Sequence, residues 1–221
     1  MTPPVERRRQ QLALAAAALL AGLGLWQLGG AALIHGKAWL AQVLLESAWQ
    51  ASLADGGRAV RPWPWADSYP VARLTVPSLG VDQIVLAGAS GRSLAFAPGH
   101  LDGTARPGAA GHSIISGHRD THFRFLQRLA PGAMIELQRA DGLRRQYRVT
   151  ESRVIDARRA RLSAGDGRAA LTLVTCYPFD ALVPGGPLRY LVFAEDSAPA
   201  ALGPKRVVNR IPRTISSTPT R

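Results

Sequence analysis

The only cysteine of this 221-residue chain, Cys176, ends an apolar run that begins at Leu171. Free cysteine is among the most buried residue types and commonly packs as a small hydrophobic side chain. Its thiolate is also a strong nucleophile, provided that cationic neighbours lower the thiol pKa from its ordinary value of about 8.5. The rest of the sequence must therefore decide between a buried thiol and a reactive one.

Two other side chains could complete a reaction at this thiol. His118 lies in the segment Gly117–Thr121, and an imidazole can protonate a departing amine, as acyl transfer from an amide requires. Arg189 opens an apolar segment, and its permanently charged guanidinium could hold a carbonyl or a developing oxyanion through fixed donors. Taken alone, Arg189 would be a surface or salt-bridged residue. The three together predict acyl transfer through a thioester.

Neighbouring polar residues allow other interpretations. Asp120 could orient the His118 imidazole, but a loop carboxylate that caps the following helix explains it equally well. Four histidines, at positions 100, 112, 118 and 122, raise the question of a zinc site. Their spacing matches no standard ligand pair such as the helical HExxH arrangement, so we expect neither a metal nor another cofactor.

Composition bounds the possible partners. The formal net charge of +12 is concentrated at the ends, with three arginines at 7–9 and five basic residues without an acid in 197–221. No basic stripe with aromatic residues and no zinc-finger spacing accompanies it, so nucleic acid is not an expected partner. The hydrophobic fraction of 47% suits one folded domain with appendages. A single cysteine neither requires nor excludes an oxidising compartment.

The elements that must position the site begin with an apolar N-terminal segment. Residues 12–34 carry no charge and would span about 34 Å as a helix, enough to cross a bilayer. A cleaved signal peptide is the alternative, with a possible site at Gly30-Ala31-Ala32, but its apolar core is normally only about 7–15 residues long. The arginines at 7–9 place the N-terminus in the cytoplasm by the positive-inside rule. We expect an uncleaved anchor and an extracytoplasmic body.

A juxtamembrane stalk should follow the anchor. Helical periodicity continues from Lys37 to Ala54, Asp55-Gly56-Gly57 should stop the helix, and a proline- and tryptophan-rich stretch reads as a stiff linker. Trp39 and Trp49 would suit an interfacial belt, although core packing explains them almost as well. The expected divisions are a cytoplasmic basic N-terminus (1–11), a transmembrane helix (12–36), a juxtamembrane helix and linker (37–65), a catalytic domain (66–196) and a disordered basic tail (197–221).

Short apolar runs separated by turn signals predict strands after residue 66. We expect them at 72–78, 83–87, 113–116, 135–138, 147–150, 154–155, 171–176 and 188–194, with a hairpin turn at Asp141-Gly142. Thr121 should cap a short helix that runs to Leu129, with Phe123 and Leu126 or Leu129 facing inward. Seven or eight strands without alternating helices predict an all-β barrel or sandwich.

Three separated segments resemble the signature segments of sortases, in the same order and with similar spacing. They are Gly117–Thr121 with the histidine, Leu171–Phe179 with the cysteine, and Arg189–Val192 with the arginine. The likeness covers about residues 66–195. The Cys-Tyr-Pro-Phe and Gly-His-Arg-Asp-Thr sequences are most similar to sortases of Gram-negative bacteria, called class GN or the marine proteobacterial type.

The resemblance implies a closed eight-stranded β-barrel with short helices and the activity of a membrane-anchored cysteine transpeptidase. Such an enzyme cleaves a C-terminal Leu-Pro-x-Thr-Gly-like sorting signal on a secreted protein and transfers the protein to an amine acceptor. Cys176 would be the nucleophile, His118 the general acid and base, and Arg189 the clamp on substrate or oxyanion. We also assign Thr175 as a candidate substrate-binding residue and Asp120 as a candidate orienting residue. The expected location is the inner membrane, as a single-pass protein with a periplasmic catalytic domain.

Two alternatives stay open. One is a cysteine hydrolase or L,D-transpeptidase-like cell-wall enzyme, although Val174-Thr175 precedes the thiol instead of the Ser-x-Gly of that family. The other is a non-catalytic anchored β-domain with a buried Cys176, which would bind the envelope through its basic tail. Contact of the tail with anionic lipid or an envelope polymer is an alternative to a solvated extension.

Overall fold

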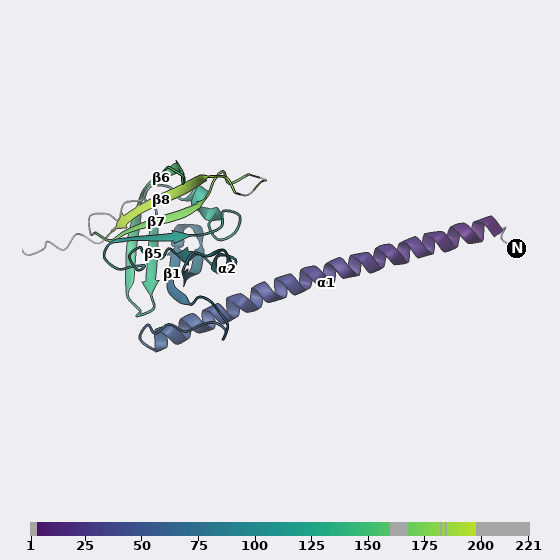
Figure 1. The fold of residues 1–221 in the computed structure, drawn as a ribbon, viewed down its shortest axis with the longest axis horizontal. Helices are drawn as coiled ribbons and strands as arrows, with labels where there is room; N and C mark the ends of the chain where they lie inside the picture. Colours follow the sequence, from purple (N-terminus) through teal and green to yellow (C-terminus); the bar gives the residue numbers. More distant parts are fainter. Residues whose placement is uncertain (1–3, 160–167, 182, 184, 198–221) are drawn as a thin grey trace, which may run out of the picture.

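The computed structural model describes residues 4–159, 168–181, 183 and 185–197. It begins with a single long helix, α1 (Pro4–Ala54), which leads to a β-barrel at its C-terminal end (Figure 1). Among the described residues, α1 is the one helix that is both long enough and apolar enough to cross a membrane. Its large apolar side chains between Leu12 and Ile34 are exposed. The helix ends before Asp55-Gly56-Gly57, where Gly56 and Gly57 take positive φ angles that favour glycine.

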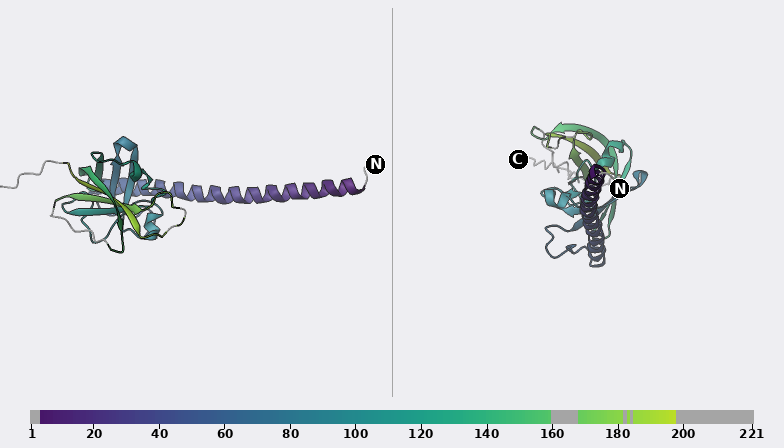
Figure 2. Two further views of the ribbon diagram at one scale, coloured as in Figure 1. Left: turned by 90° about the horizontal axis from the view of Figure 1, so that it is seen from above. Right: turned by 90° about the vertical axis from the view of Figure 1, so that its right-hand side faces the viewer.

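A closed barrel follows at the end of α1 (Figure 2). It has eight strands in the order β1-β2-β3-β4-β7-β8-β6-β5. Neighbouring strands are antiparallel except for β2 with β3 and β4 with β7, which are parallel. This confirms the all-β class and the eight-stranded barrel. The strands are β1 (Pro70–Val76), β2 (Val81–Ala87), β3 (Gly99–His100), β4 (His112–Ser116), β5 (Met134–Arg139), β6 (Arg144–Asp156), β7 (Ala170–Cys176) and β8 (Leu188–Asp196), and the short helices are η1 (Pro77–Leu79), α2 (Gly91–Leu94) and η2 (Arg124–Arg128).

Alternating side chains fill the barrel. β1 shows strict alternation between buried and half-buried residues, as expected when one face of a strand meets the core. Phe123, Leu126 and Leu129 pack into the same core, so the inward-facing positions predicted for this segment are confirmed. The helix that carries them is a 3-10 helix, and no side chain caps it, so the expected cap at Thr121 is wrong.

Two other expectations about local structure are also corrected. Val154-Ile155 is not a separate strand, because β6 runs without interruption from Arg144 to Asp156. A register shift between Val149 and Glu151 lets this long strand continue its pairing with β8. The two-residue strand β3 was not expected, since so short a segment carries no periodicity.

The last turns of α1 are part of the folded body and not a free stalk. Leu45 and Trp49 are fully buried and pack with Ile84 and Leu86 of β2 and with Ala97 in a second apolar cluster. Trp49 is therefore a core residue, whereas Trp39, ten positions earlier on the same helix, is 68% exposed. The barrel thus shares a core with a segment that we expected to lie outside the domain.

Candidate active site

Cys176 is the last residue of β7, at one rim of the barrel. Its side chain is partly exposed, so the thiol is not sealed in the core. β7 lies between β4 and β8 in the barrel order, and both neighbours bring a predicted site residue to the same rim. The position of the thiol therefore follows from strand pairing.

His118 lies at the same rim as the thiol, on the β4 side. In the parallel pair of β4 and β7, Ser116 is the register partner of Val174, and His118 and Cys176 stand two residues beyond that pair on their respective chains. The Gly117 N–H donates to the Val174 carbonyl at 3.1 Å, which continues the pairing past the end of β4. The exposed His118 side chain follows directly.

Only glycine fits at position 117, because the backbone there lies close to the ring of Phe123. A Cβ at this position would lie 2.8–3.0 Å from three ring carbons of Phe123, a separation that real Cβ atoms do not show. Phe123 is fully buried in the barrel core. The absent side chain therefore lets the loop with His118 lie flat on the core aromatic ring.

Arg189 flanks the thiol from the β8 side. Cys176 and Arg189 are direct register partners in the antiparallel pair of β7 and β8. Directly opposed residues project from the same face, with Cβ atoms about 4.5–5.5 Å apart. Nη1 of Arg189 donates to the carbonyls of Gly186 at 2.7 Å and Leu188 at 2.9 Å, which fixes the guanidinium. Its Nε and Nη2 have no partner among the residues that the structure describes, so these donors are free for a substrate.

Arg119 is a functional candidate that the sequence analysis missed. Only 8% of its side chain is exposed, and Nη1 and Nη2 donate to the carbonyls of Pro178 at 2.8 Å and Ala181 at 2.6 Å. It therefore ties the loop after β4, which holds His118, to the segment that follows Cys176. Its position next to His118 was the only sequence feature that could have identified Arg119 as a candidate. The sequence does not indicate which of the many arginines is buried.

Asp120 does not contact the imidazole that we expected it to orient. Its carboxylate accepts a hydrogen bond from Nε of Arg119 at 3.2 Å, and 70% of the side chain is exposed. Within the described part of the chain, no hydrogen bond joins Asp120 to His118. Asp120 thus supports the buried guanidinium.

Thr175 is also placed differently from the substrate contact that we expected. Its side chain is 1% exposed, and its hydroxyl donates to the Gly117 carbonyl at 2.7 Å. Together with the Gly117–Val174 bond, this contact fastens the residue before His118 to β7. The geometry favours a positioning role for Thr175.

Aromatic residues follow Cys176 and Arg189 in the chain, and their rings pack against one another. Tyr177 stacks on Tyr190 with ring centroids 6.2 Å apart, and Phe179 meets Tyr190 edge-on at 5.2 Å. Tyr177 directly follows the thiol and Tyr190 directly follows the guanidinium. Successive residues of a strand face opposite sides, so Tyr190 lies on the face opposite Arg189, and both Phe179 and Tyr190 pack against the barrel core.

Two of the four histidines that raised the question of zinc, His100 and His112, have separate surroundings. The His100 ring contacts Thr104 and Ala105, and the His112 ring contacts Thr172. Among the described residues, no group of three or more histidine, cysteine or acidic side chains gathers at one point.

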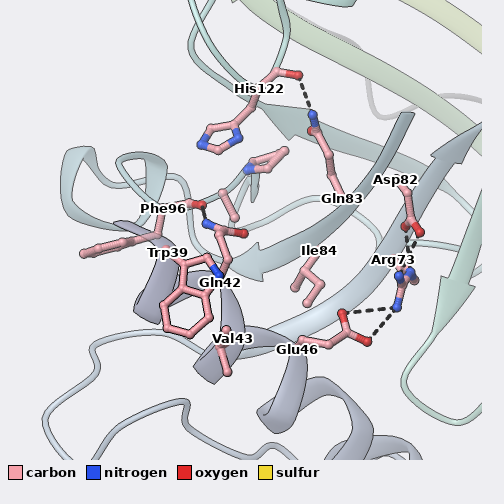
Figure 3. A pocket seen from close by; sticks show the side chains of 12 residues that line it. Trp39, Gln42, Val43, Glu46, Arg73, Asp82, Gln83, Ile84, Phe96 and His122 are labelled. Atoms are coloured by element: carbon pink, nitrogen blue, oxygen red, sulfur yellow. Dashed lines mark hydrogen bonds and ion pairs between the residues drawn. The ribbon is translucent and has the colours of Figure 1, made fainter. Parts of the chain in front are cut away.

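His122 lies near His118, at a cavity of about 430 Å³ between α1 and the barrel (Figure 3). Its backbone carbonyl accepts a hydrogen bond from Gln83 at 2.9 Å. Burial lowers the pKa of His122 from its ordinary value, and the nearby charge of His118 acts in the same direction. The neutral imidazole is therefore favoured at this position.

Comparison with protein families gives one match, to the sortase domain, over residues 74–197. Sortase D of Bacillus subtilis is 27% identical over 123 residues, which are 55% of this chain and 61% of that protein. The chain thus spans less than two thirds of the length of this curated relative.

Solved structures of sortases have the same fold. A sortase D5 transpeptidase of Clostridium perfringens matches 71% of this chain and 98% of its own, with 22% identity and a TM-score of 0.56. Sortase A of Corynebacterium diphtheriae matches 74% and 87%, with 23% identity and a TM-score of 0.54. Sortase C1 of Streptococcus agalactiae matches 57% and 67%, with 26% identity and a TM-score of 0.51.

Proposed function

This chain belongs to the sortase family, and from that premise we propose that it is a membrane-anchored cysteine transpeptidase with Cys176, His118 and Arg189 as its catalytic residues. One observation carries the proposal. The strand order β4-β7-β8 brings the chain segments of all three residues to one rim, with the thiol in the middle. Residues so far apart in sequence share this rim because β7 pairs with β4 on one side and with β8 on the other.

The first half of the reaction forms a thioester. The Cys176 thiolate attacks the carbonyl carbon of the scissile amide, and the free donors of Arg189 hold the oxygen as it becomes negative. When the carbon–nitrogen bond breaks, the departing amine takes a proton from the His118 imidazolium. The substrate's N-terminal part is then bound to sulfur.

The second half transfers the acyl group to a new amine. The incoming amine attacks the thioester carbon and gives a proton to His118, and the carbon–sulfur bond breaks to return the thiolate. A new amide replaces the old one, and the enzyme regains its starting protonation state.

The proposed donor is a secreted protein with a C-terminal Leu-Pro-x-Thr-Gly-like sorting signal, and the acceptor is a primary amine. We propose α1 as the anchor in the inner membrane, with Arg8 and Arg9 on the cytoplasmic side and the barrel in the periplasm. The Cys-Tyr-Pro-Phe and Gly-His-Arg-Asp-Thr sequences support placement in class GN, the type of Gram-negative bacteria.

The exposure of Cys176 argues against the non-catalytic alternative, which required a buried thiol. The alternative of a cysteine hydrolase or L,D-transpeptidase-like cell-wall enzyme differs in its donor, a cell-wall peptide, or in its acceptor, water, so substrate and product separate it from the sortase reaction. We would incubate the full chain in detergent with a Leu-Pro-x-Thr-Gly peptide and a primary amine, and identify products by mass spectrometry. We expect an amide-linked product that disappears with Cys176→Ala. A free acid as the sole product would establish the hydrolase, and an unreactive thiol without turnover would refute both enzymes.

A further inference from the structure

A groove of about 780 Å³ runs between α1 and the barrel, away from the Cys176 rim. Its walls are apolar and aromatic, with Leu40 and Leu44 from α1 facing Trp63, Trp65 and Phe96. Trp63 meets Phe96 edge-on with ring centroids 5.3 Å apart, so this wall is built and not a chance gap between loops. Lys37 and Arg92 also line the groove.

The apolar residues around this groove are unusually open to solvent. At the groove, Trp65 is 79% exposed and Leu40 is also exposed. On the adjacent face of α1, which lines the cavity beside His122, Trp39 is 68% exposed and Val43 is also exposed. Exposed apolar residues scattered singly need no explanation, but a contiguous patch of this kind marks a contact with another apolar phase. Tryptophan is the residue type most typical of the membrane–water interface.

The groove lies where that interface would be. Lys37 directly follows the expected end of the membrane span at residue 36, so at about 1.5 Å per helical residue Trp39 and Leu40 lie roughly 5–6 Å beyond it. The headgroup layer on each side of the hydrocarbon core is about 5–8 Å thick. Helix α2, with Arg92, lies on the side of the barrel toward the N-terminal part of α1 (Figure 1).

The charges at the groove suit a phosphate group. Lys37 is exposed and has no acidic partner among the described residues. Arg92 donates to Asp67 at 3.1 Å, but both side chains are largely exposed, which leaves the remaining guanidinium donors accessible. Lining residues therefore carry one net positive charge beside an apolar wall.

We propose that this groove binds a phospholipid at the outer surface of the bilayer, with the lipid phosphate at Lys37 and Arg92 and with Trp39 and Trp65 in the headgroup layer. The proposal rests on the membrane anchoring proposed above for α1. It gives the barrel a second attachment to the membrane, beside the helix, and so fixes its orientation relative to the surface.

Quenching of tryptophan fluorescence by brominated phospholipid tests both attachments in the full chain. The chain would be reconstituted in vesicles of phosphatidylcholine with roughly one third phosphatidylglycerol. Trp26 lies within the proposed span, Trp65 at the groove and Trp49 in the shared core. We expect Trp26→Phe and Trp65→Phe each to remove a quenched component, and Trp49→Phe to remove none.

The outcomes separate the two proposals. A quenched component that depends on Trp26 but not on Trp65 would leave the anchor standing and overturn the lipid groove. A chain without any quenched component at Trp26 would overturn the anchor, and the groove proposal with it.

Charge substitutions test the phosphate contact. We expect Lys37→Gln with Arg92→Gln to reduce the quenching of Trp65 at least about twofold in the anionic vesicles. The matched control is Arg144→Gln with Arg148→Gln, two exposed arginines on β6 that do not line the groove. Equal quenching in the test and control variants would overturn the assignment of the phosphate to Lys37 and Arg92.

Discussion

At the Cys176 rim, the roles of individual residues follow from how each is held. Arg189 has one nitrogen fixed by two backbone carbonyls and keeps its other donors for a ligand. The Thr175 hydroxyl donates its hydrogen bond to the Gly117 carbonyl, and the side chain has almost no exposed surface. At the same rim, Arg189 thus has donors that could bind a substrate, whereas Thr175 can only position its neighbours.

Replacing Arg189 with lysine should abolish most activity, because an ammonium is a point charge without the planar fork of a guanidinium. We expect kcat/KM for the sorting-signal peptide to fall by about 10²–10³, the usual effect of losing an oxyanion donor. Arg148→Lys, at an exposed position on β6, is the matched control and should retain normal rates. Near-normal rates in the Arg189→Lys variant would remove this residue from the site.

Thr175→Val tests the positioning role of the hydroxyl. The isosteric change leaves the buried Gly117 carbonyl without its donor, which should cost about 1–3 kcal/mol of unfolding free energy and lower kcat about tenfold. Thr172→Val is the control, since Thr172 is also buried on β7 but bonds His112 instead. It should lose stability without a matching loss of kcat. Equal loss of kcat in both variants would mean that Thr175 acts only through stability.

His122 should make the folded chain sensitive to mild acid. Its pKa is lowered in the folded state, so below about pH 6.5 the unfolded chain binds the proton more readily, and stability falls as pH falls. Above that pH both states are neutral and His122 contributes no pH dependence. We expect Tm to decline as the pH falls below about 6.5, and His122→Gln to flatten that decline.

Burial is the larger cause of the lowered His122 pKa, and the His118 charge is the smaller one. His118→Gln should therefore preserve most of the acid sensitivity. If the decline in Tm vanished in His118→Gln but persisted in His122→Gln, the assignment to His122 would be wrong.

At the scale of elements, two loops depend on one buried guanidinium. Arg119 joins the loop after β4 to Pro178 and Ala181, so the imidazole and the thiol are positioned as one unit. No regular secondary structure links these segments beyond the ends of β4 and β7. We therefore regard Arg119 as a positioning residue for the whole rim.

Arg119→Lys should loosen this unit, because one ammonium cannot reproduce the two contacts of the guanidinium. We expect faster amide hydrogen exchange at residues 117–123 and 177–181, together with a roughly tenfold lower kcat. Arg124→Lys, at an exposed position in the same loop region, is the control. Unchanged exchange at residues 177–181 in Arg119→Lys would contradict the tie between the loops.

Most strands could be predicted because side-chain alternation survives wherever one face of a strand meets the core. Thr172 and Leu173 of β7 belong to an apolar run, and the β5–β6 hairpin has an Asp-Gly turn signal. The continuity of β6 could not be predicted, because its register shift breaks the alternation between Val149 and Glu151. The contacts of Asp120 with Arg119 and of Thr175 with Gly117 could not be predicted, because only the tertiary structure decides which atom a polar side chain meets.

At the scale of the whole molecule, α1 belongs to two environments. Its N-terminal part extends away from the barrel (Figure 1) and has exposed apolar side chains. Its last turns share a core with β2. Glu46 reinforces this contact, since it accepts a hydrogen bond from Arg73 of β1 at 2.9 Å, and Arg73 also pairs with Asp82 of β2. The sequence could not reveal this packing, because an apolar helix face looks the same whether lipid or protein covers it.

We therefore expect substitutions of the two tryptophans in this part of α1 to affect stability very differently. Trp49 is fully buried against β2, so Trp49→Ala should leave a cavity that lowers the unfolding free energy by about 3–5 kcal/mol. Trp39 is 68% exposed, so Trp39→Ala should change it by no more than about 0.5 kcal/mol. Urea unfolding of the full chain in detergent, followed by near-ultraviolet circular dichroism, measures both. If Trp49→Ala were as stable as Trp39→Ala, α1 would be the free stalk that the sequence suggested, and the barrel would fold without it.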